Sequence, residues 1–128
     1  MERSYEFVLN GKFLAARNKS VYAPQEANPN GETHEDRGMI SFDRARKKFI
    51  FRQFHVEGYV SQYAAESIEE GAKRIVFVSE AIENIPPGWR ARETYTILSA
   101  DEFTETFELA EPGKDFEVYS EARLKRKK

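Results

Sequence analysis

Hydrophobic and polar residues alternate along most of this chain, with the period of two that a β-strand produces. The alternation is clearest from Lys73 to Leu98, KRIVFVSEAIENIPPGWRARETYTIL, where two long segments flank the loop Asn84 to Gly88. The loop contains Pro86 and Pro87, which cannot donate hydrogen bonds to a sheet, so the chain must leave the sheet there. This stretch therefore predicts two long antiparallel strands joined by one loop.

The rest of the chain repeats this plan with different turns. Asn10-Gly11 favours a hairpin because both residues tolerate positive φ, whereas Ala23 to His34, APQEANPNGETH, lacks periodicity and predicts a long loop. Glu69-Glu70-Gly71 predicts the turn that precedes the central hairpin. The other predicted strands are Ser4 to Leu9, Lys12 to Tyr22, Glu35 to Phe42, Phe49 to His55, Tyr59 to Ser67, Phe103 to Leu109 and Phe116 to Leu124.

About nine successive antiparallel strands in 128 residues predict a single all-β domain, residues 1–128. An up-and-down meander of this kind either closes into a barrel, which removes both sheet edges, or folds into a clam of two sheets. A Greek-key sandwich needs long crossovers, and only residues 23–34 are long enough to form one. We therefore expect an antiparallel barrel of about nine or ten strands.

Alternation also predicts which side chains face the interior. The inward sets are Trp89, Ala91, Glu93, Tyr95 and Ile97; Phe103, Glu105, Phe107 and Leu109; and Phe116, Val118, Ser120, Ala122 and Leu124. Glu93 and Glu105 lie in apolar company, so each needs a hydrogen-bond donor or a raised pKa. In the strand Phe49 to His55 both faces are apolar enough to be covered, and the pattern does not choose between them.

Composition and charge exclude several classes of protein. The net charge of −2 gives no electrostatic footprint for nucleic acid, and the absence of cysteine excludes disulfides and thiolate metal sites. No apolar run approaches the roughly 20 residues of a membrane helix, and the N-terminal residues do not resemble a signal peptide. These features predict a cytoplasmic protein that binds neither nucleic acid nor membrane.

The residues that could carry chemistry are few. His55, with Gln53 before it and Tyr59 after a tight turn, could hold a ligand, a proton or a metal, or could be a structural histidine. Glu93 and Glu105 could form an acid–base pair across a cavity, or could each pair with Arg or Tyr. His34 lies among several carboxylates and could belong to a weak metal site, but its spacing matches no known metal pattern, and a solvated loop is expected instead. No catalytic or metal-ligating residue is assigned from the sequence.

The segments YEFVLNGKFL, FRQFHVEGYV and SEAIENIPPGWRARETYTIL resemble bacterial single-domain members of the calycin superfamily, which are fatty-acid-binding-protein-like barrels. The resemblance implies a calycin-like barrel with an interior that holds a small molecule. Members typically open with an additional strand that carries a Gly-x-Trp element, and this sequence lacks it. One branch, the nitrobindin-like proteins, binds haem through a histidine late in the chain. Here the last histidine is His55, so no cofactor is expected and haem is an alternative.

Together these features favour a non-enzymatic barrel that binds a small apolar or amphiphilic molecule. The alternatives are an enzyme doing acid–base chemistry on a small carbonyl or ester, and a structural homo-oligomer without a ligand. The apolar strand Phe49 to Val56 and the absent opening strand also predict a homodimer. The predicted ligand-binding residues are Gln53, His55, Trp89, Glu93, Tyr95, Phe103, Glu105 and Phe107.

Overall fold

The computed structural model describes residues 2–24, 26, 29–66, 68 and 71–127, and within them every regular element is a β-strand. The strands are β1 (Glu2–Val8), β2 (Phe13–Tyr22), β3 (Glu32–Asp43), β4 (Lys48–His55), β5 (Val60–Ala65), β6 (Arg74–Glu83), β7 (Arg90–Ser99), β8 (Glu102–Ala110) and β9 (Glu117–Lys125). The all-β prediction is therefore confirmed.

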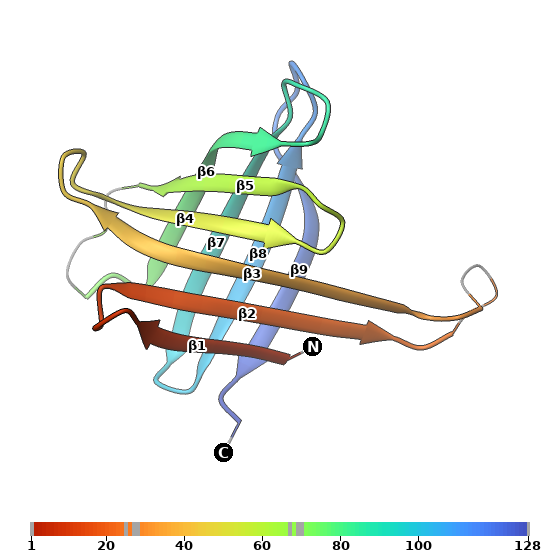
Figure 1. The fold of residues 1–128 in the computed structure, drawn as a ribbon, viewed down its shortest axis with the longest axis horizontal. Helices are drawn as coiled ribbons and strands as arrows, with labels where there is room; N and C mark the ends of the chain where they lie inside the picture. The colour runs from red at the N-terminus through yellow and green to blue at the C-terminus, as the bar shows by residue number, and fades with distance from the viewer. Residues whose placement is uncertain (1, 25, 27–28, 67, 69–70, 128) are drawn as a thin grey trace.

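The nine strands form one sheet in which each strand pairs, antiparallel, with the next strand along the chain. The sheet curls on itself: in Figure 1, β1–β5 cross in front of β6–β9, so the inner faces of the two groups lie opposite each other. The result is a half-barrel whose end strands are β1 and β9. The up-and-down meander predicted from the alternation is the observed topology.

Two predicted turns have the backbone geometry that their sequences require. Asn10 and Gly11 have φ values of 62° and 74°, within a loop that runs from Leu9 to Lys12. The loop after β6 begins at Asn84, with φ of 68°, and its side-chain amide donates to the Gly58 carbonyl oxygen at 2.9 Å. Both positions confirm that the polar and glycine-rich signals mark the ends of strands.

The loop expected at residues 23–34 is shorter than predicted, because β3 begins at Glu32. Thr33 and His34 continue the ladder opposite Val21 and Ser20 of β2, so His34 belongs to a strand rather than to a solvated loop. The backbone pairing outweighs the weak local propensity of this polar segment. Ser67, Glu69 and Glu70, where a strand end and a turn were predicted, lie outside the described residues.

The structure decides which face of β4 points inward. Phe51 packs on Tyr63 with ring centroids 5.8 Å apart, so Phe49, Phe51, Gln53 and His55 share the interior face. On the outer face Phe54 is 53% exposed, whereas Ile50 is 2% exposed. The strand is therefore apolar on both sides, but its outer side is covered only at one end.

The predicted inward set of the last strand is wrong at its N-terminal end. A bulge between Phe107 and Glu108 shifts the register with β9, so that Val118 pairs with the outward Glu108 and is 59% exposed. Phe116 precedes the strand and lies under the guanidinium groups of Arg90 and Arg92 at 4.8 and 4.4 Å. An extra residue in one strand reverses the inward and outward positions beyond it, and the alternation alone does not reveal it.

The core lies between the two groups of strands and is mainly aromatic. Its buried members are Phe51, Tyr63, Ala65, Phe77 and Ala91. Gly38 of β3 faces this core, and a Cβ at this position would lie 2.4 Å from the Phe51 ring, so only glycine lets the ring approach.

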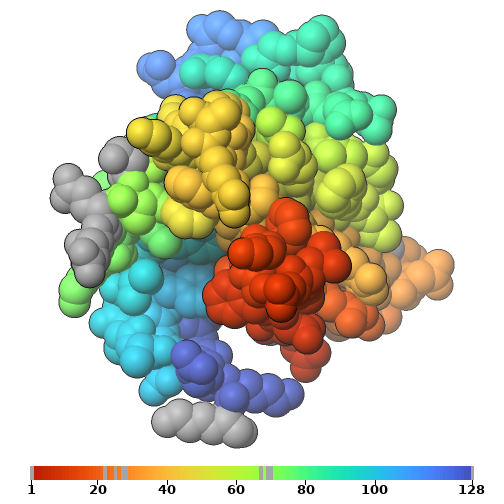
Figure 2. All heavy atoms as spheres, turned by 60° about the vertical axis from the view of Figure 1, so that its left-hand side comes forward, coloured from red at the N-terminus to blue at the C-terminus, as the bar shows by residue number. Residues whose placement is uncertain are grey.

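Figure 2 shows the N-terminal residues, in red, standing forward beside the yellow β3–β4 turn.

Candidate functional site

The inner face of the half-barrel contains a cavity of about 320 Å³. Its lining residues are Tyr59, Ser61, Tyr63, Ile82, Ile85, Pro86, Trp89, Ala91, Phe107, Leu109 and Tyr119. Among these described residues none carries a charge, and the polar groups are hydroxyls and one indole N–H. The volume is at the small end of the range of roughly 300–1,000 Å³ that is usual for small-molecule sites.

Local sequence features place these side chains around the cavity. Ser61 and Tyr63 occupy alternate positions of β5 and so share its inner face, where they are 2% and 1% exposed. Pro86 lies in the loop that the two prolines take out of the sheet, which brings that loop over the cavity. Tyr119 is the extra residue of the β9 bulge, and its ring meets Phe107 at 5.7 Å between centroids.

A buried polar cluster occupies the inner face of β2, β3 and β4. Asp36 is 7% exposed, and its two carboxylate oxygens accept hydrogen bonds from the side-chain amides of Gln53 at 2.9 Å and Asn18 at 3.1 Å. Both donors are neutral. The carboxylate is therefore held in one orientation, while its charge is not balanced by either hydrogen-bond partner.

A second polar group links β1 to the opposite side of the half-barrel. Arg3 forms an ion pair with Glu105 of β8, and the Nη2–Oε1 distance is 3.1 Å. Burial and the nearby charge of Glu105 raise the pKa of Glu93 to about 8, and Tyr95 donates a hydrogen bond to Glu93 at 2.7 Å. Glu105 thus has the basic partner that the sequence required, and Glu93 has a hydroxyl donor and a raised pKa.

His55 lies at the end of β4, between the polar cluster and the cavity. Its ring stacks on Tyr59 with centroids 4.0 Å apart, and Tyr59 lines the cavity. Both ring nitrogens are enclosed and have no hydrogen-bond partner among the described residues. Burial lowers the pKa of the imidazole despite the opposing charge of Asp36. An axial haem ligand needs room beside a ring nitrogen for the whole porphyrin, and the enclosed nitrogens of His55 leave no such room, so His55 does not fit that role.

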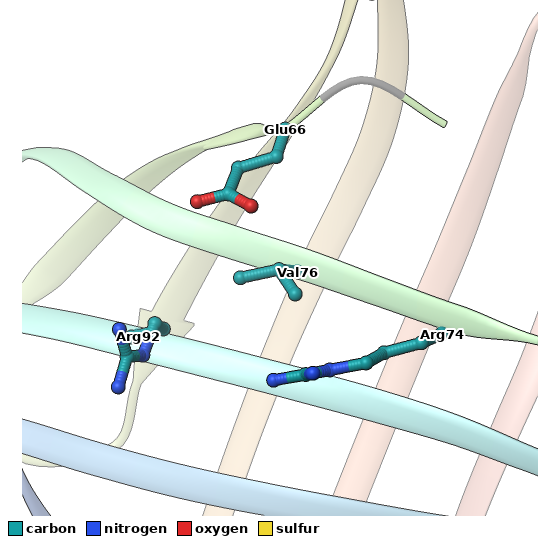
Figure 3. A pocket seen from close by; sticks show the side chains of 4 residues that line it. All are labelled: Glu66, Arg74, Val76 and Arg92. Carbon is teal, nitrogen blue, oxygen red and sulfur yellow. The ribbon is translucent and has the colours of Figure 1, made fainter. Parts of the chain in front are cut away.

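A hollow of similar size lies on the outer face of the sheet, where Figure 3 shows Glu66, Arg74, Val76 and Arg92 around it. Arg74 and Val76 of β6 and Arg92 of β7 alternate with the inward Phe77 and Ala91, and Glu66 follows β5. Arg92 is held by Glu108 at 2.7 Å, as expected for an outward arginine. This hollow has no connection with the interior groups described above, and we do not assign a site to it.

The predicted site residues fall into three places. Trp89 and Phe107 line the cavity. Tyr95 and Phe103 pack on each other at 6.0 Å between centroids, beside Tyr5 and the buried carboxyl of Glu93. Gln53 and His55 belong to the polar region of β4, and Glu105 pairs with Arg3.

The sequence reasoning missed several residues of the interior. Ser61, Tyr63 and Ile82 line the cavity. Outside the cavity, Arg3 is the partner of Glu105, and Asp36 is the partner of Gln53 and Asn18. Alternation along β5 could have indicated Ser61 and Tyr63. The partners across the half-barrel could not be found in this way, because Arg3 and Glu105 are 102 residues apart in the chain.

No protein-family model and no curated protein matches this sequence. Within the described residues the structure contains no helix long and apolar enough to cross a membrane.

Proposed function

We propose that this protein binds a small, uncharged amphiphilic molecule in the interior cavity. The observation that carries the proposal is the cavity of about 320 Å³ with an aromatic and aliphatic wall and several hydroxyl groups. A ligand with an apolar body and one or two hydrogen-bonding groups matches this lining. A charged group would be costly there, because no lining residue offers an opposite charge.

The architecture supports an assignment to the calycin-like barrels, whose interiors hold such ligands. Nine antiparallel strands in consecutive order, curled so that one face is enclosed, match such a barrel without the additional opening strand that members typically have. Within the cavity, Trp89 and Phe107 supply apolar wall, and the hydroxyls of Ser61 and Tyr63 are the groups that can orient a polar ligand atom. The polar anchor of the ligand is therefore proposed on β5, beside His55 rather than at Glu105.

An acid–base enzyme is less well supported by the geometry. Glu93 is 5% exposed and bonded to Tyr95, and Glu105 is bonded to Arg3, so neither carboxyl belongs to the cavity wall. A general acid or base must come within hydrogen-bond reach of its substrate. The other alternative, a structural homo-oligomer without a ligand, does not account for the cavity. Ligand binding is accordingly the function we retain.

Binding can be measured through Trp89, which is the single tryptophan of the chain and lines the cavity. The neutral fluorophore N-phenyl-1-naphthylamine serves as the probe, with anionic 8-anilino-1-naphthalenesulfonate for comparison. We expect the neutral probe to quench Trp89 by energy transfer and to saturate at one site per chain. The anionic probe should bind more weakly because the lining has no cation.

Two matched substitutions locate the probe. Ala91→Leu adds bulk to a cavity-lining position, whereas Ala81→Leu adds the same bulk to an exposed position of β6. Ala91→Leu should abolish probe binding, and Ala81→Leu should leave it unchanged, with thermal unfolding as the check that both fold. Equal binding by both variants, or no saturable quenching of the parent protein, would contradict the proposal.

A homodimer is a further part of the proposal. Phe54 and Val56 on the outer side of β4 and its following turn are 53% and 62% exposed, and a second copy of the chain would cover them. Light scattering should give twice the 14.9 kDa of one chain. Phe54→Glu should then return the mass to that of the monomer. A monomeric parent protein at micromolar concentration would remove this part of the proposal.

A further inference from the structure

Two histidines and one aspartate meet at the edge of the polar cluster. Asp36 of β3 pairs directly with His55 of β4, and His34 lies two residues before Asp36 on the same face of β3. One ligand atom from each of the three side chains lies within 4.8 Å of the other two. Within the described residues this is the one group of three such side chains that lie so close together.

His55 contributes nitrogens that the protein itself leaves unpaired. Both ring nitrogens are shielded from solvent, and neither has a hydrogen-bond partner in the part of the chain that the structure describes. A buried polar atom without a partner is costly, and most such atoms in folded proteins are paired. A cation bound at one nitrogen would give that nitrogen a partner, since neutral imidazole is a common metal ligand.

Asp36 provides the negative charge. Its oxygens accept from two neutral amides, and the basic group that faces it is His34, whose Nε2 lies 4.0 Å from Asp36 Oδ2 and is charged only if protonated. The buried carboxylate therefore lacks a permanent cation at close range. Asn18 and Gln53 fix its orientation, as residues around metal sites commonly do for ligating carboxylates.

His34 is oriented with one nitrogen toward the cluster. Its Nδ1 lies 3.0 Å from Glu57 Oε1, and this carboxylate favours a proton on Nδ1. The Nε2 lone pair is then free on the side of Asp36. A carboxylate on the outer nitrogen of a histidine is the usual arrangement around protein-bound zinc, because it fixes the tautomer and makes the ligand more basic.

From this geometry we propose that His34, Asp36 and His55 bind a divalent transition-metal ion of the Zn²⁺ class. Two imidazole nitrogens and one carboxylate oxygen suit zinc and its neighbours better than magnesium or calcium, which prefer oxygen ligands. Metal–ligand bonds of about 2.0–2.2 Å require the ligand atoms to move closer than they are now. His34 can make this adjustment because its side chain is 30% exposed at the end of the half-barrel. Three protein ligands leave at least one coordination position for water or an external donor.

The test uses the full chain with Zn²⁺ and with Co²⁺ as a spectroscopic probe. We expect one Zn²⁺ per chain by calorimetry and visible absorption bands from bound Co²⁺. The chain has only two histidines, so the imidazole nitrogens can be followed individually by NMR, and Zn²⁺ should shift the signals of both. Zn²⁺ should also raise the unfolding temperature, because it binds only the folded chain at this site.

Three substitutions separate this site from adventitious binding. Loss of a residue that merely orients a metal ligand commonly lowers affinity about 10–100-fold, so His34→Gln and Asp36→Asn should lower it at least about 100-fold. Glu35→Gln removes a carboxylate from the opposite face of β3 and should leave the affinity unchanged. If Asp36→Asn fails to fold, the Zn²⁺ affinity of His34→Gln alone tests the site.

Retained Zn²⁺ affinity in His34→Gln would overturn the assignment, as would equal losses in Asp36→Asn and Glu35→Gln. Absence of a stoichiometric site in the parent protein would do the same. Because neither the metal titration nor the NMR shifts depend on the cavity ligand, failure of this proposal is distinguishable from failure of the proposed binding function.

Discussion

Two neighbouring regions of the inner face are both buried but are held together differently. The aromatic cluster consists of Phe51, Tyr63 and Phe77, which are 1–4% exposed and contact one another through ring faces and edges. The polar cluster consists of Asn18, Asp36 and Gln53, which are 7–8% exposed and contact one another through hydrogen bonds. Both regions are largely shielded from solvent, so the main difference between them is the kind of contact.

The difference lies in what each region requires of its neighbours. Apolar contacts are non-directional, so the aromatic cluster stabilises the fold through the area it buries. The polar cluster requires a partner for each atom, and it contributes orientation more than net stability. The unpaired Gln53 Oε1 and the nearby His55 nitrogens show where that requirement is not met within the chain. We therefore expect metal binding at the polar edge, and we expect the aromatic cluster to contribute most to stability.

The largest expected effect is in the aromatic cluster. Phe77 is 4% exposed, and its ring lies 5.6 Å from that of Phe51 and 6.0 Å from that of Tyr95, measured between centroids. Phe77→Ala should cost about 3–5 kcal/mol of unfolding free energy, because it removes apolar contacts and leaves a cavity. Phe7→Ala is the matched control, since Phe7 is 72% exposed. Urea denaturation of both variants measures the difference, and similar losses would contradict the location of the core.

A smaller loss is expected from breaking the polar link across the half-barrel. Arg3→Met leaves Glu105 without its ion-pair partner, and the side chains are 9% and 13% exposed. We expect a loss of roughly 2–3 kcal/mol, typical of a hydrogen bond to a charged group with limited access to water. Adding Glu105→Gln should recover part of this loss, because the unpaired charge is then absent. Strictly additive losses in the double-mutant cycle would show that the two residues do not interact.

The smallest effect, for a change of one pH unit, is in the pH dependence of stability. The pKa of Glu93 is raised to about 8 by burial, so at pH values between about 5 and 8 the folded state keeps a proton that the unfolded chain has lost. Stability should therefore fall as the pH rises through this range, by up to about 1.4 kcal/mol per pH unit. Glu93→Gln should flatten this slope. Denaturation midpoints at several pH values give the comparison, and identical slopes would exclude a raised pKa.

The alternation of residues predicted the fold class and most inner faces because antiparallel pairing of consecutive strands preserves it. Phe103, Glu105 and Phe107 share a face as expected. Phe103 and Glu105 meet Tyr5 and Arg3 of β1 across the interior, and Phe107 meets Tyr119 on the neighbouring strand β9. The prediction was wrong at Val118, where a bulge inserts Tyr119 and reverses the pattern. A bulge depends on how the neighbouring strands twist, which local sequence does not encode clearly.

The candidate sites were less accessible to sequence reasoning. His34 was assigned to a loop because Asn, Pro and Gly precede it, yet strand pairing places it on β3 near His55. Trp89 and Phe107 were recognised as apolar wall from their alternation. Ser61 was not recognised as a cavity residue, since a serine occurs both in cores and on surfaces and its role depends on its surroundings. Contacts between residues far apart in the sequence can be predicted only if the register of every intervening strand is known, and each bulge changes that register.

The ion pair between Arg3 and Glu105 has a consequence for folding kinetics. Every strand pairs with its neighbour in sequence, so each hairpin can form from contacts at short sequence separation. Bringing β1 onto β8 instead closes a loop of about 100 residues, which carries a larger entropic cost. We expect this contact to form after the folding transition state, so that Arg3→Met accelerates unfolding and leaves the folding rate nearly unchanged. Stopped-flow measurements of both rates test this. Slower folding of the variant would show that the contact forms before the transition state.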